Sequence, residues 1–337
     1  MSDNTLYIRA DMNDEIATGH VMRCLSIADS AKVRGIKTVF ISADDQPKSL
    51  VESRGYESVI LGTAWDDMES EITELTKVIN KKNISSLLID SYKVTEEYLR
   101  KVNALTRVYY LDDLNAFPYP VHAVINYANY ADENFYPVRF PGTMFYLGSA
   151  YAPLRGAFKN TLPKKIRYDI HNLLVMSGGA DPFGILEQIL DAIPLDEFRQ
   201  VNVICGKYNK KGNYLKEKYM FHPSVRVHSG VDKIWEFYDI TDLAVSAGGS
   251  TLYELASMGV PTITYSMADN QIRNVRSLDL DGLMPCAGDV RGGNVPARVA
   301  QLIKELAPVD IRTDYSRKLR RTIDGKGADR LVNILFS

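Results

Sequence analysis

A glycine turn near residue 250 is the part of this chain best suited to chemistry. Residues 246–249 are typical of a strand end and a turn, after which a helix opens with two hydroxyl residues. Glycine lets a backbone approach a phosphate closely, and the start of a helix favours an anion. Such turns are also common as packing turns, so both interpretations stay open. The candidate phosphate ligands are Gly248, Gly249, Ser250 and Thr251.

Glu254 follows this turn and has two interpretations of its own. It lies three residues after Thr251, so it fits a capping box, in which a carboxylate bonds a backbone amide at a helix start. The functional alternative is that Glu254 binds the ribose hydroxyls of a nucleotide. The sequence by itself does not choose between these two roles.

A second candidate site lies near the N-terminus. Gly19 and His20 are expected to open the helix that follows the first strand, Arg9 to Asp11 marking the end of that strand. In open α/β sheets, ligands bind at the carboxyl ends of the strands. A helix start disfavours positive charge, so a neutral imidazole is available to accept a proton. The alternatives are that His20 only caps the helix or packs between loops, and that Arg23 pairs with Asp11 or is solvated.

Strand-like and helical segments that alternate along the chain must position these residues. The first half predicts strands over residues 6–10, 38–42, 58–61, 86–90 and 107–111, and helices over residues 19–33, 48–54, 67–81 and 95–104. The pattern pauses in a stretch rich in proline and tyrosine, residues 112–167, and further strands follow over residues 172–177, 201–205, 243–246 and 262–265. This alternation predicts an α/β fold with parallel sheets.

Length and composition predict two domains without a membrane span. A chain of 337 residues fits two domains, which we expect over residues 1–155 and 156–337. The last helix of the chain is expected to pack back on the N-terminal domain. The net charge of −2 gives no attraction for nucleic acid or anionic lipid. No apolar run approaches the roughly 20 residues of a bilayer span. The polar start and three scattered cysteines indicate a cytoplasmic protein without a secretory signal.

Several motifs together resemble a known family. Residues 9–11 and 19–25 resemble the opening signature of the UDP-2,4-diacetamido-2,4,6-trideoxy-β-L-altropyranose hydrolases of pseudaminic acid biosynthesis. Further motifs follow in the family's order, at residues 90–92, 111–113, 148–155, 177–181 and 246–254. The resemblance spans about residues 6 to 280. The C-terminal half is also similar to nucleotide-sugar glycosyltransferases of the GT-B fold, especially the MurG type.

This resemblance implies two Rossmann-like domains of the GT-B type, with a nucleotide sugar between them. It implies three catalytic residues, namely His20, Tyr92 and Asn270. The residues it implies for substrate and nucleotide binding are Arg9, Asp11, Gly19, Arg23, Arg155, Ser177, Gly178, Gly179, Gly248, Gly249, Ser250, Thr251, Glu254, Gln271 and Asn274. The chain departs from the family pattern at residues 12–13 and 17–18, which places the identity of the sugar in doubt. The expected state is a monomer without a cofactor.

The expected reaction is hydrolysis of a UDP-sugar with inversion. His20 deprotonates water, which attacks the anomeric carbon, and the helix starts after two glycine loops stabilise the leaving UDP without a metal. Asp112 and Asp113 follow a strand end, so a role near the site stays open for them. The alternatives are a GT-B glycosyltransferase with a sugar or lipid acceptor, and a sugar-nucleotide binding protein without catalysis.

Overall fold

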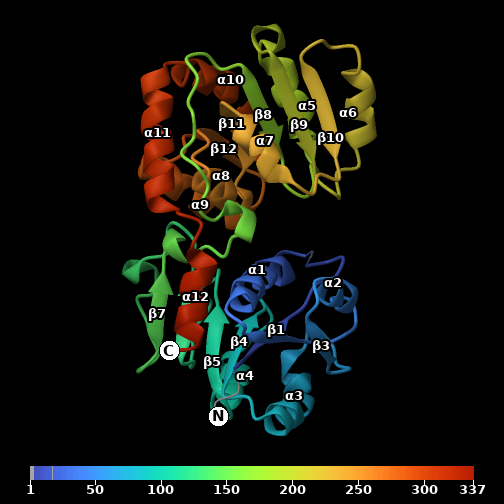
Figure 1. Cartoon of the computed structure of the whole chain (residues 1–337), viewed down its shortest axis with the longest axis vertical. Coiled ribbons are helices and arrows are strands. Elements are labelled where there is room, and N and C mark those ends of the chain that lie inside the picture. Colours follow the sequence, from blue (N-terminus) through green and yellow to red (C-terminus); the bar gives the residue numbers. More distant parts are fainter. Residues whose placement is uncertain (1–3, 17) are drawn as a thin grey trace. The chain divides into compact units, whose positions relative to one another are not determined.

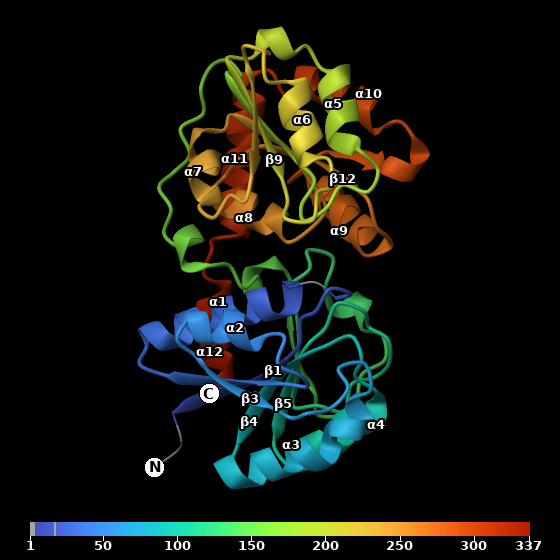
Figure 2. The ribbon, with the colours of Figure 1, turned by 90° about the vertical axis from the view of Figure 1, so that its right-hand side faces the viewer.

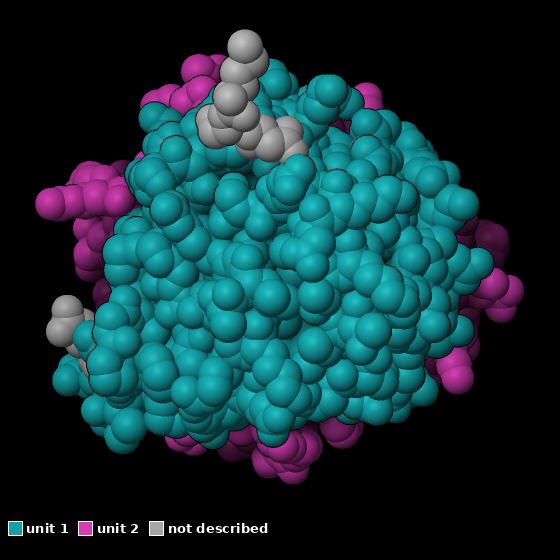
Figure 3. Space-filling model, turned by 90° about the horizontal axis from the view of Figure 1, so that it is seen from below, with its two compact units in different colours: residues 1–156, 325–337 teal, residues 157–324 magenta. Residues whose placement is uncertain are grey.

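The computed structural model describes residues 4–16 and 18–337. They fold into two compact units, drawn in teal and magenta in Figure 3. Unit 1 contains the described residues up to Gly156 together with Gly325–Ser337, and unit 2 contains Ala157–Asp324. Among the described residues, no helix has the length and apolar character needed to cross a membrane. Residue 17, one of the positions where the chain departs from the family pattern, lies outside the described residues.

Unit 1 is built on one parallel sheet of seven strands with the order β3-β2-β1-β4-β5-β6-β7 (Figure 1). The strands are β1 (Thr5–Ala10), β2 (Lys37–Ser42), β3 (Glu57–Ile60), β4 (Ser86–Asp90), β5 (Arg107–Leu111), β6 (Ala123–Asn126) and β7 (Met144–Leu147). The helices are α1 (Gly19–Val33), α2 (Lys48–Ser53), α3 (Met68–Lys82), α4 (Glu96–Asn103) and α12 (Gly327–Leu335), with 3-10 turns η1 (Glu133–Phe135), η2 (Ser149–Tyr151) and η3 (Gly156–Phe158).

Both faces of this sheet are covered by helices. Successive strand residues point to opposite faces, so Ile8 of β1 belongs to an apolar cluster with α1 and α12, whereas its neighbour Tyr7 belongs to a cluster with α3 and α4. Figure 2 shows α1 and α2 on one side of the strands and α3 on the other. Ser30 of α1 donates to Asp329 of α12 at 2.6 Å, which fastens the last helix to unit 1.

Unit 2 repeats this architecture on a parallel sheet of six strands with the order β10-β9-β8-β11-β12-β13. Its strands are β8 (Asn172–Met176), β9 (Gln200–Cys205), β10 (Val225–Ser229), β11 (Leu243–Ala247), β12 (Thr262–Ser266) and β13 (Cys286–Asp289). Its helices are α5 (Ile185–Ala192), α6 (Gly212–Lys218), α7 (Ile234–Ile240), α8 (Thr251–Ser257), α9 (Asp269–Leu280), α10 (Val295–Glu305) and α11 (Val309–Thr322), with η4 (Leu195–Glu197) and η5 (Val290–Gly292).

The strand order reverses once in each sheet, and the candidate residues lie at these two points. In unit 1 the chain runs outward from β1 in both directions, so β1 and β4 are neighbours; in unit 2 the neighbours are β8 and β11. A ligand crevice forms at such a reversal, outside the carboxyl ends of the strands. His20 follows β1 and Asp90 ends β4, while Ser177 and Gly248 follow β8 and β11.

The α/β fold class predicted from the sequence is confirmed, and the strands and helices lie close to the predicted ranges. The stretch over residues 112–167, however, is not a simple pause in the pattern. It contains β6 and β7, which pair in parallel and extend the sheet of unit 1. Each has four residues between proline-containing loops, too few to show a periodic pattern.

Candidate active site

His20 and Asp90 form a buried pair at the reversal point of unit 1. The Nδ1 atom of His20 lies 2.5 Å from Oδ1 of Asp90, and only 5% of His20 is exposed. α1 supplies the histidine and the last residue of β4 supplies the carboxylate. Because neighbouring parallel strands end at the same edge, the fold brings together residues 70 positions apart.

The neighbours of His20 fix which ring nitrogen carries the proton. Besides Asp90, Nδ1 lies 3.3 Å from a terminal nitrogen of Arg23, but a guanidinium only donates. The ionised carboxylate of Asp90 can only accept, so this hydrogen bond requires Nδ1–H as the donor and leaves the lone pair on Nε2. The approach of Arg23 to Nδ1 is then a contact between two donors and not a hydrogen bond. Among the described residues, Nε2 has no hydrogen-bond partner. A histidine held in this way by a carboxylate is arranged as a general base.

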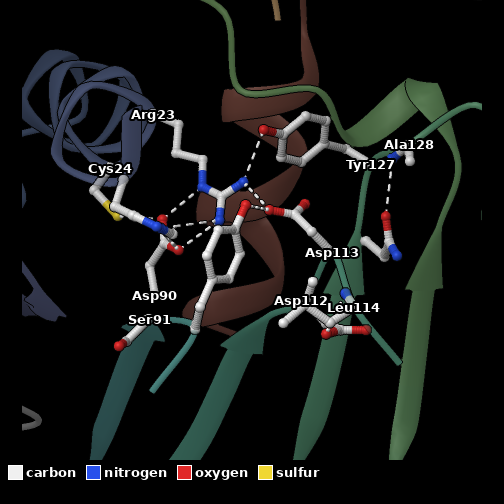
Figure 4. Close-up of polar contacts among 12 residues, drawn as sticks. Arg23, Cys24, Asp90, Ser91, Asp112, Asp113, Leu114, Tyr127 and Ala128 are labelled. Atoms are coloured by element: carbon white, nitrogen blue, oxygen red, sulfur yellow. Dashed lines mark hydrogen bonds and ion pairs between the residues drawn. The ribbon is translucent and has the colours of Figure 1, made fainter. Parts of the chain in front are cut away.

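Arg23 joins this pair to a second carboxylate. Its Nε and one terminal nitrogen donate to both oxygens of Asp90, at 2.6 and 2.5 Å. Its other terminal nitrogen donates to Asp113 at 2.7 Å and to the hydroxyl of Tyr127 at 3.0 Å (Figure 4). A two-pronged guanidinium contact fixes both the position and the charge of a carboxylate.

Tyr92 lies beside the imidazole and is also tied to Asp113. Its ring meets His20 edge-on, with ring centroids 4.5 Å apart, and its hydroxyl donates to Asp113 at 2.7 Å. We call the set His20, Arg23, Asp90, Tyr92 and Asp113 the histidine cluster. The structure thus brings together three predicted site residues, His20, Arg23 and Tyr92.

The charges of the histidine cluster follow from these contacts. Burial by itself would raise the pKa of Asp90, but Arg23 and then His20 outweigh burial and hold that pKa well below its usual range. Burial raises the pKa of the Tyr92 hydroxyl, and the Asp113 carboxylate raises it further. Asp90 is therefore a carboxylate and Tyr92 a neutral phenol at neutral pH, so Tyr92 is a donor and not a base.

Asp90 is the site residue that sequence reasoning missed, whereas for Asp113 it had left a role near the site open. Asp90 stands in the same short motif as Tyr92, and its position at a strand end next to the first strand was the available signal. Asp112 and Asp113 have separate functions in the structure. Asp112 accepts hydrogen bonds from the hydroxyls of Tyr119, in the same loop, and Tyr136, in the loop that follows β6, whereas Asp113 belongs to the histidine cluster.

Arg9 and Asp11 do not fit the expected substrate contacts. Arg9 is fully buried, where its guanidinium pairs with Glu71 of α3 and, at 2.5 Å, with Asp11. Tyr98 donates to the same Glu71 at 2.7 Å, and Asp11 also accepts from the amide of Ala43 at 2.9 Å. We therefore assign both residues to a buried network that holds the end of β1. Arg23, for its part, pairs with Asp90 and Asp113 and not with Asp11.

The two glycines in the glycine turn of unit 2 (residues 248–251) differ in the space that surrounds them. A Cβ atom on Gly248 would lie 2.6 Å from Val275 of α9, whereas one on Gly249 would meet nothing within 4 Å. The amides of Leu252 and Tyr253 donate to Gly249 and Ser250. Among the described residues, no acceptor is recorded for the amides of Ser250 and Thr251. Gly248 therefore serves helix packing, and the turn beyond it presents open donors.

The loop after β8 differs from the expected anion site. Asp181 accepts hydrogen bonds from the amides of Ile185 and Leu186, at 2.8 and 3.1 Å, so a carboxylate already occupies the start of α5. The expectation that two helix starts face the leaving group is therefore wrong for this loop. Gly178 has a φ of +79°, a conformation natural to glycine. The Ser177 hydroxyl is buried without a partner among the described residues.

The remaining predicted residues lie in α8, in α9, and near the start and at the end of the unit 1 segment that precedes unit 2. The N-cap of α8 is Ser250 and not Thr251, and it makes no side-chain capping bond. Glu254 is therefore four residues after the cap, one too many for the capping box, and it accepts from the Tyr238 hydroxyl at 3.4 Å. Asn274 is buried and accepts from Tyr253 at 2.8 Å, and Gln271 accepts from the amide of Met267. Arg155 after η2 is partly exposed, and Asn270 in the first turn of α9 is exposed. Gly19 is the first residue of α1.

The comparisons with known proteins give relatives but no matching family model. The spore coat polysaccharide biosynthesis protein SpsG of Bacillus subtilis is 23% identical over 336 residues, covering 97% of this chain and 96% of SpsG. An uncharacterized protein of Methanocaldococcus jannaschii is 22% identical, and the chain spans 54% of its length. A processive diacylglycerol beta-glucosyltransferase of Bacillus pumilus is 29% identical over 128 residues, which is 35% of this chain and 33% of that enzyme.

The fold has a clear counterpart among solved structures. The MurG structure of Acinetobacter baumannii matches with a TM-score of 0.71 at 14% identity, covering 98% of this chain and 99% of MurG. The chain has a GT-B fold. The relatives and the fold support a place in the broad superfamily of GT-B glycosyltransferases. None of these four proteins is named as a hydrolase, so the narrower hydrolase family stays a prediction.

Proposed function

We propose that this chain is an enzyme that transfers a glycosyl group from a nucleotide sugar, with His20 as the general base. The observation that carries the proposal is the 2.5 Å contact between Nδ1 of His20 and Asp90. It leaves Nε2 with a lone pair for a proton, at the reversal point where α/β sheets bind ligands. The superfamily of GT-B glycosyltransferases supports the choice of donor.

In the proposed reaction, Nε2 of His20 removes the proton of an incoming hydroxyl. The oxygen of that hydroxyl attacks the anomeric carbon, and the bond from this carbon to the diphosphate oxygen breaks. The bonding electrons leave with the nucleoside diphosphate. The imidazolium that forms is stabilised by the negatively charged Asp90. Arg23 keeps Asp90 ionised, and Tyr92 limits rotation of the imidazole through its edge-on contact.

Unit 2 would bind the nucleotide. The amides of Ser250 and Thr251 supply open donors for the diphosphate, and Gly249 leaves room for it to approach. Glu254 supplies a carboxylate for ribose hydroxyls. Asn270 lies exposed in the first turn of the neighbouring α9, where its amide can contact the sugar. These assignments keep Gly249, Ser250, Thr251 and Glu254 as nucleotide residues, and they change the expected functions of Gly248 and of the loop after β8.

The acceptor is the point on which two functions differ. Transfer to a sugar or lipid hydroxyl is the first candidate, because the Bacillus pumilus relative is named as a diacylglycerol glucosyltransferase. Hydrolysis, in which water is the acceptor, is the second candidate. It is supported by the resemblance of residues 19–25 and 90–92 to the hydrolase signature. Both reactions need the same base and the same leaving group.

One experiment separates these functions. The purified chain is incubated with UDP-, TDP-, GDP- and CDP-sugars, and free nucleoside diphosphate and reducing sugar are both measured, with and without a panel of acceptors. Diphosphate release that requires an acceptor supports transfer, while equal release of diphosphate and reducing sugar without one supports hydrolysis. Tight binding of a nucleotide sugar without turnover in any mixture would contradict both and indicate a binding protein.

A further inference from the structure

The loop that follows β9 is locked onto the loop that follows β8. A Cβ atom on Gly206 would lie 2.0 Å from the carbonyl oxygen of Gly178 and 2.5 Å from that of Gly179. The amide of Tyr208 also donates to the carbonyl of Gly179 at 2.9 Å. Only glycine at position 206 permits this approach. The 206–211 loop is therefore packed directly against the 177–179 loop and is held in a fixed position beside it.

The 206–211 loop carries a cation, Lys207, and an exposed aromatic ring, Tyr208. The Tyr208 side chain is 44% exposed, and its Cδ2 atom lies 3.9 Å from the position of a Cβ atom on Gly179. The ammonium of Lys207 lies 5.7 Å from the centroid of the Tyr208 ring. Among the described residues, Lys207 has no carboxylate partner, whereas Lys211 lies 4.0 Å from Glu187. Lys207 is thus a free charge held beside an exposed ring.

The 177–179 loop needs a nearby cation in order to bind a diphosphate, because a carboxylate already lies beside it. The first amides of α5 are already bonded to Asp181, which brings a negative charge to this loop. A carboxylate at that position would repel a second anion. Lys207 lies on the segment that Gly206 fixes against Gly178 and Gly179, so its charge can offset Asp181. An exposed aromatic face beside it suits a nucleobase, because every base has a π-face for stacking.

We propose that the 206–211 loop belongs to the nucleotide site, with Lys207 binding the diphosphate and Tyr208 stacking on the base. This inference rests on the proposed function, because it assumes a nucleoside diphosphate at the end of the unit 2 sheet. It extends that site to a third strand end, β9, beside β8 and β11. The Ser177 hydroxyl, buried without a partner among the described residues, supplies a further donor on the β8 side.

The test is the affinity of the full chain for UDP, or for TDP, GDP or CDP if one of these binds more tightly, measured by calorimetry. Lys207→Gln is expected to weaken binding by about ten-fold or more, as loss of a charge-assisted hydrogen bond does. Lys207→Arg keeps most of the affinity. Tyr208→Ala is expected to weaken binding on the order of ten-fold through lost stacking, and Tyr208→Phe keeps it. Lys216→Gln, with the same charge change on α6, is the control.

The outcomes separate this inference from the proposed function. If the parent chain binds none of the four diphosphates, the proposed function fails and this inference fails with it. If the parent chain binds one of them and Lys207→Gln and Tyr208→Ala bind it equally well, only the inference about the 206–211 loop is overturned. An equal loss in Lys207→Gln and Lys216→Gln would also overturn it, because the effect would then be long-range charge. All variants change exposed side chains, so their melting temperatures should match the parent's.

Discussion

Nδ1 of His20 lies 2.5 Å from Oδ1 of Asp90, and this contact orients the histidine cluster. His20 lies in α1, which follows β1, and Asp90 is the last residue of β4. These two strands are neighbours at the point where the strand order of the sheet reverses. The contact determines the tautomer of His20 and leaves Nε2 as the proton acceptor. Arg23, bonded to both oxygens of Asp90, keeps the carboxylate ionised and fixed.

Replacing His20 with asparagine is expected to remove turnover without removing nucleotide binding. Loss of a general base costs on the order of 10²–10⁴ in rate, and asparagine keeps a polar group next to Asp90. Release of nucleoside diphosphate gives the rate, and calorimetry with the same diphosphate gives the affinity. His171→Asn, at an exposed position before β8, is the matched control. A rate for His20→Asn within a few-fold of the parent would exclude His20 as the base.

Asp90→Asn tests the partner of His20 through acid stability as well as activity. Because the pKa of Asp90 is lowered in the folded chain, its stabilising contribution is present above the unfolded pKa of about 3.9 and is lost as the pH falls through the folded pKa. The parent should therefore lose melting temperature more steeply than Asp90→Asn below about pH 4. At neutral pH, the variant should lose up to about 10⁴-fold in rate, since an amide favours the wrong tautomer. Parallel acid-stability curves would contradict the lowered pKa.

Glu71→Gln is expected to destabilise unit 1 without a direct effect on nucleotide binding. Glu71 is fully buried with Arg9, and loss of one member of a buried ion pair costs about 3–5 kcal/mol. Glu74→Gln on the same helix is the control, because Glu74 pairs with Lys77 on the surface, where such pairs are worth about 0–1 kcal/mol. Urea unfolding measures both. An unchanged free energy of unfolding in Glu71→Gln, with a raised KM, would return Arg9 and Asp11 to the substrate site.

Glu254→Ala is expected to weaken nucleotide binding more than it weakens folding. The helix start at Ser250 lacks a side-chain cap, so no capping box is lost, and the ribose contact is the function we assign. Calorimetry with the diphosphate and a melting curve are compared in the same buffer. Unchanged affinity together with a lowered melting temperature would show that the contact of Glu254 with Tyr238 is its main function.

The sequence predicted the fold well because the information was local. Apolar runs and turn residues located most strands and helices, and the glycine turn and His20 both follow predicted strands. It could not predict pairings between distant residues, such as Arg9 with Glu71 or His20 with Asp90, 62 and 70 positions apart. Arg9 and Arg23 look equally suited to bind an anion in sequence. Only the fold shows that Arg9 is closed inside a buried network.

The two glycines of the glycine turn allow one residue type to be tested in two environments. Gly248→Ala would place a methyl group 2.6 Å from Val275 and 3.0 Å from Gln271, and such overpacking typically costs about 1–3 kcal/mol. Gly249→Ala would place the same methyl group in open space, so the free energy of unfolding should stay close to the parent's. If the open amides of Ser250 and Thr251 hold the diphosphate, that methyl group obstructs it, and affinity should fall while stability does not. Urea unfolding and calorimetry on both variants give four values. Stable Gly249→Ala protein with full affinity for the diphosphate would show that the phosphates bind elsewhere in unit 2.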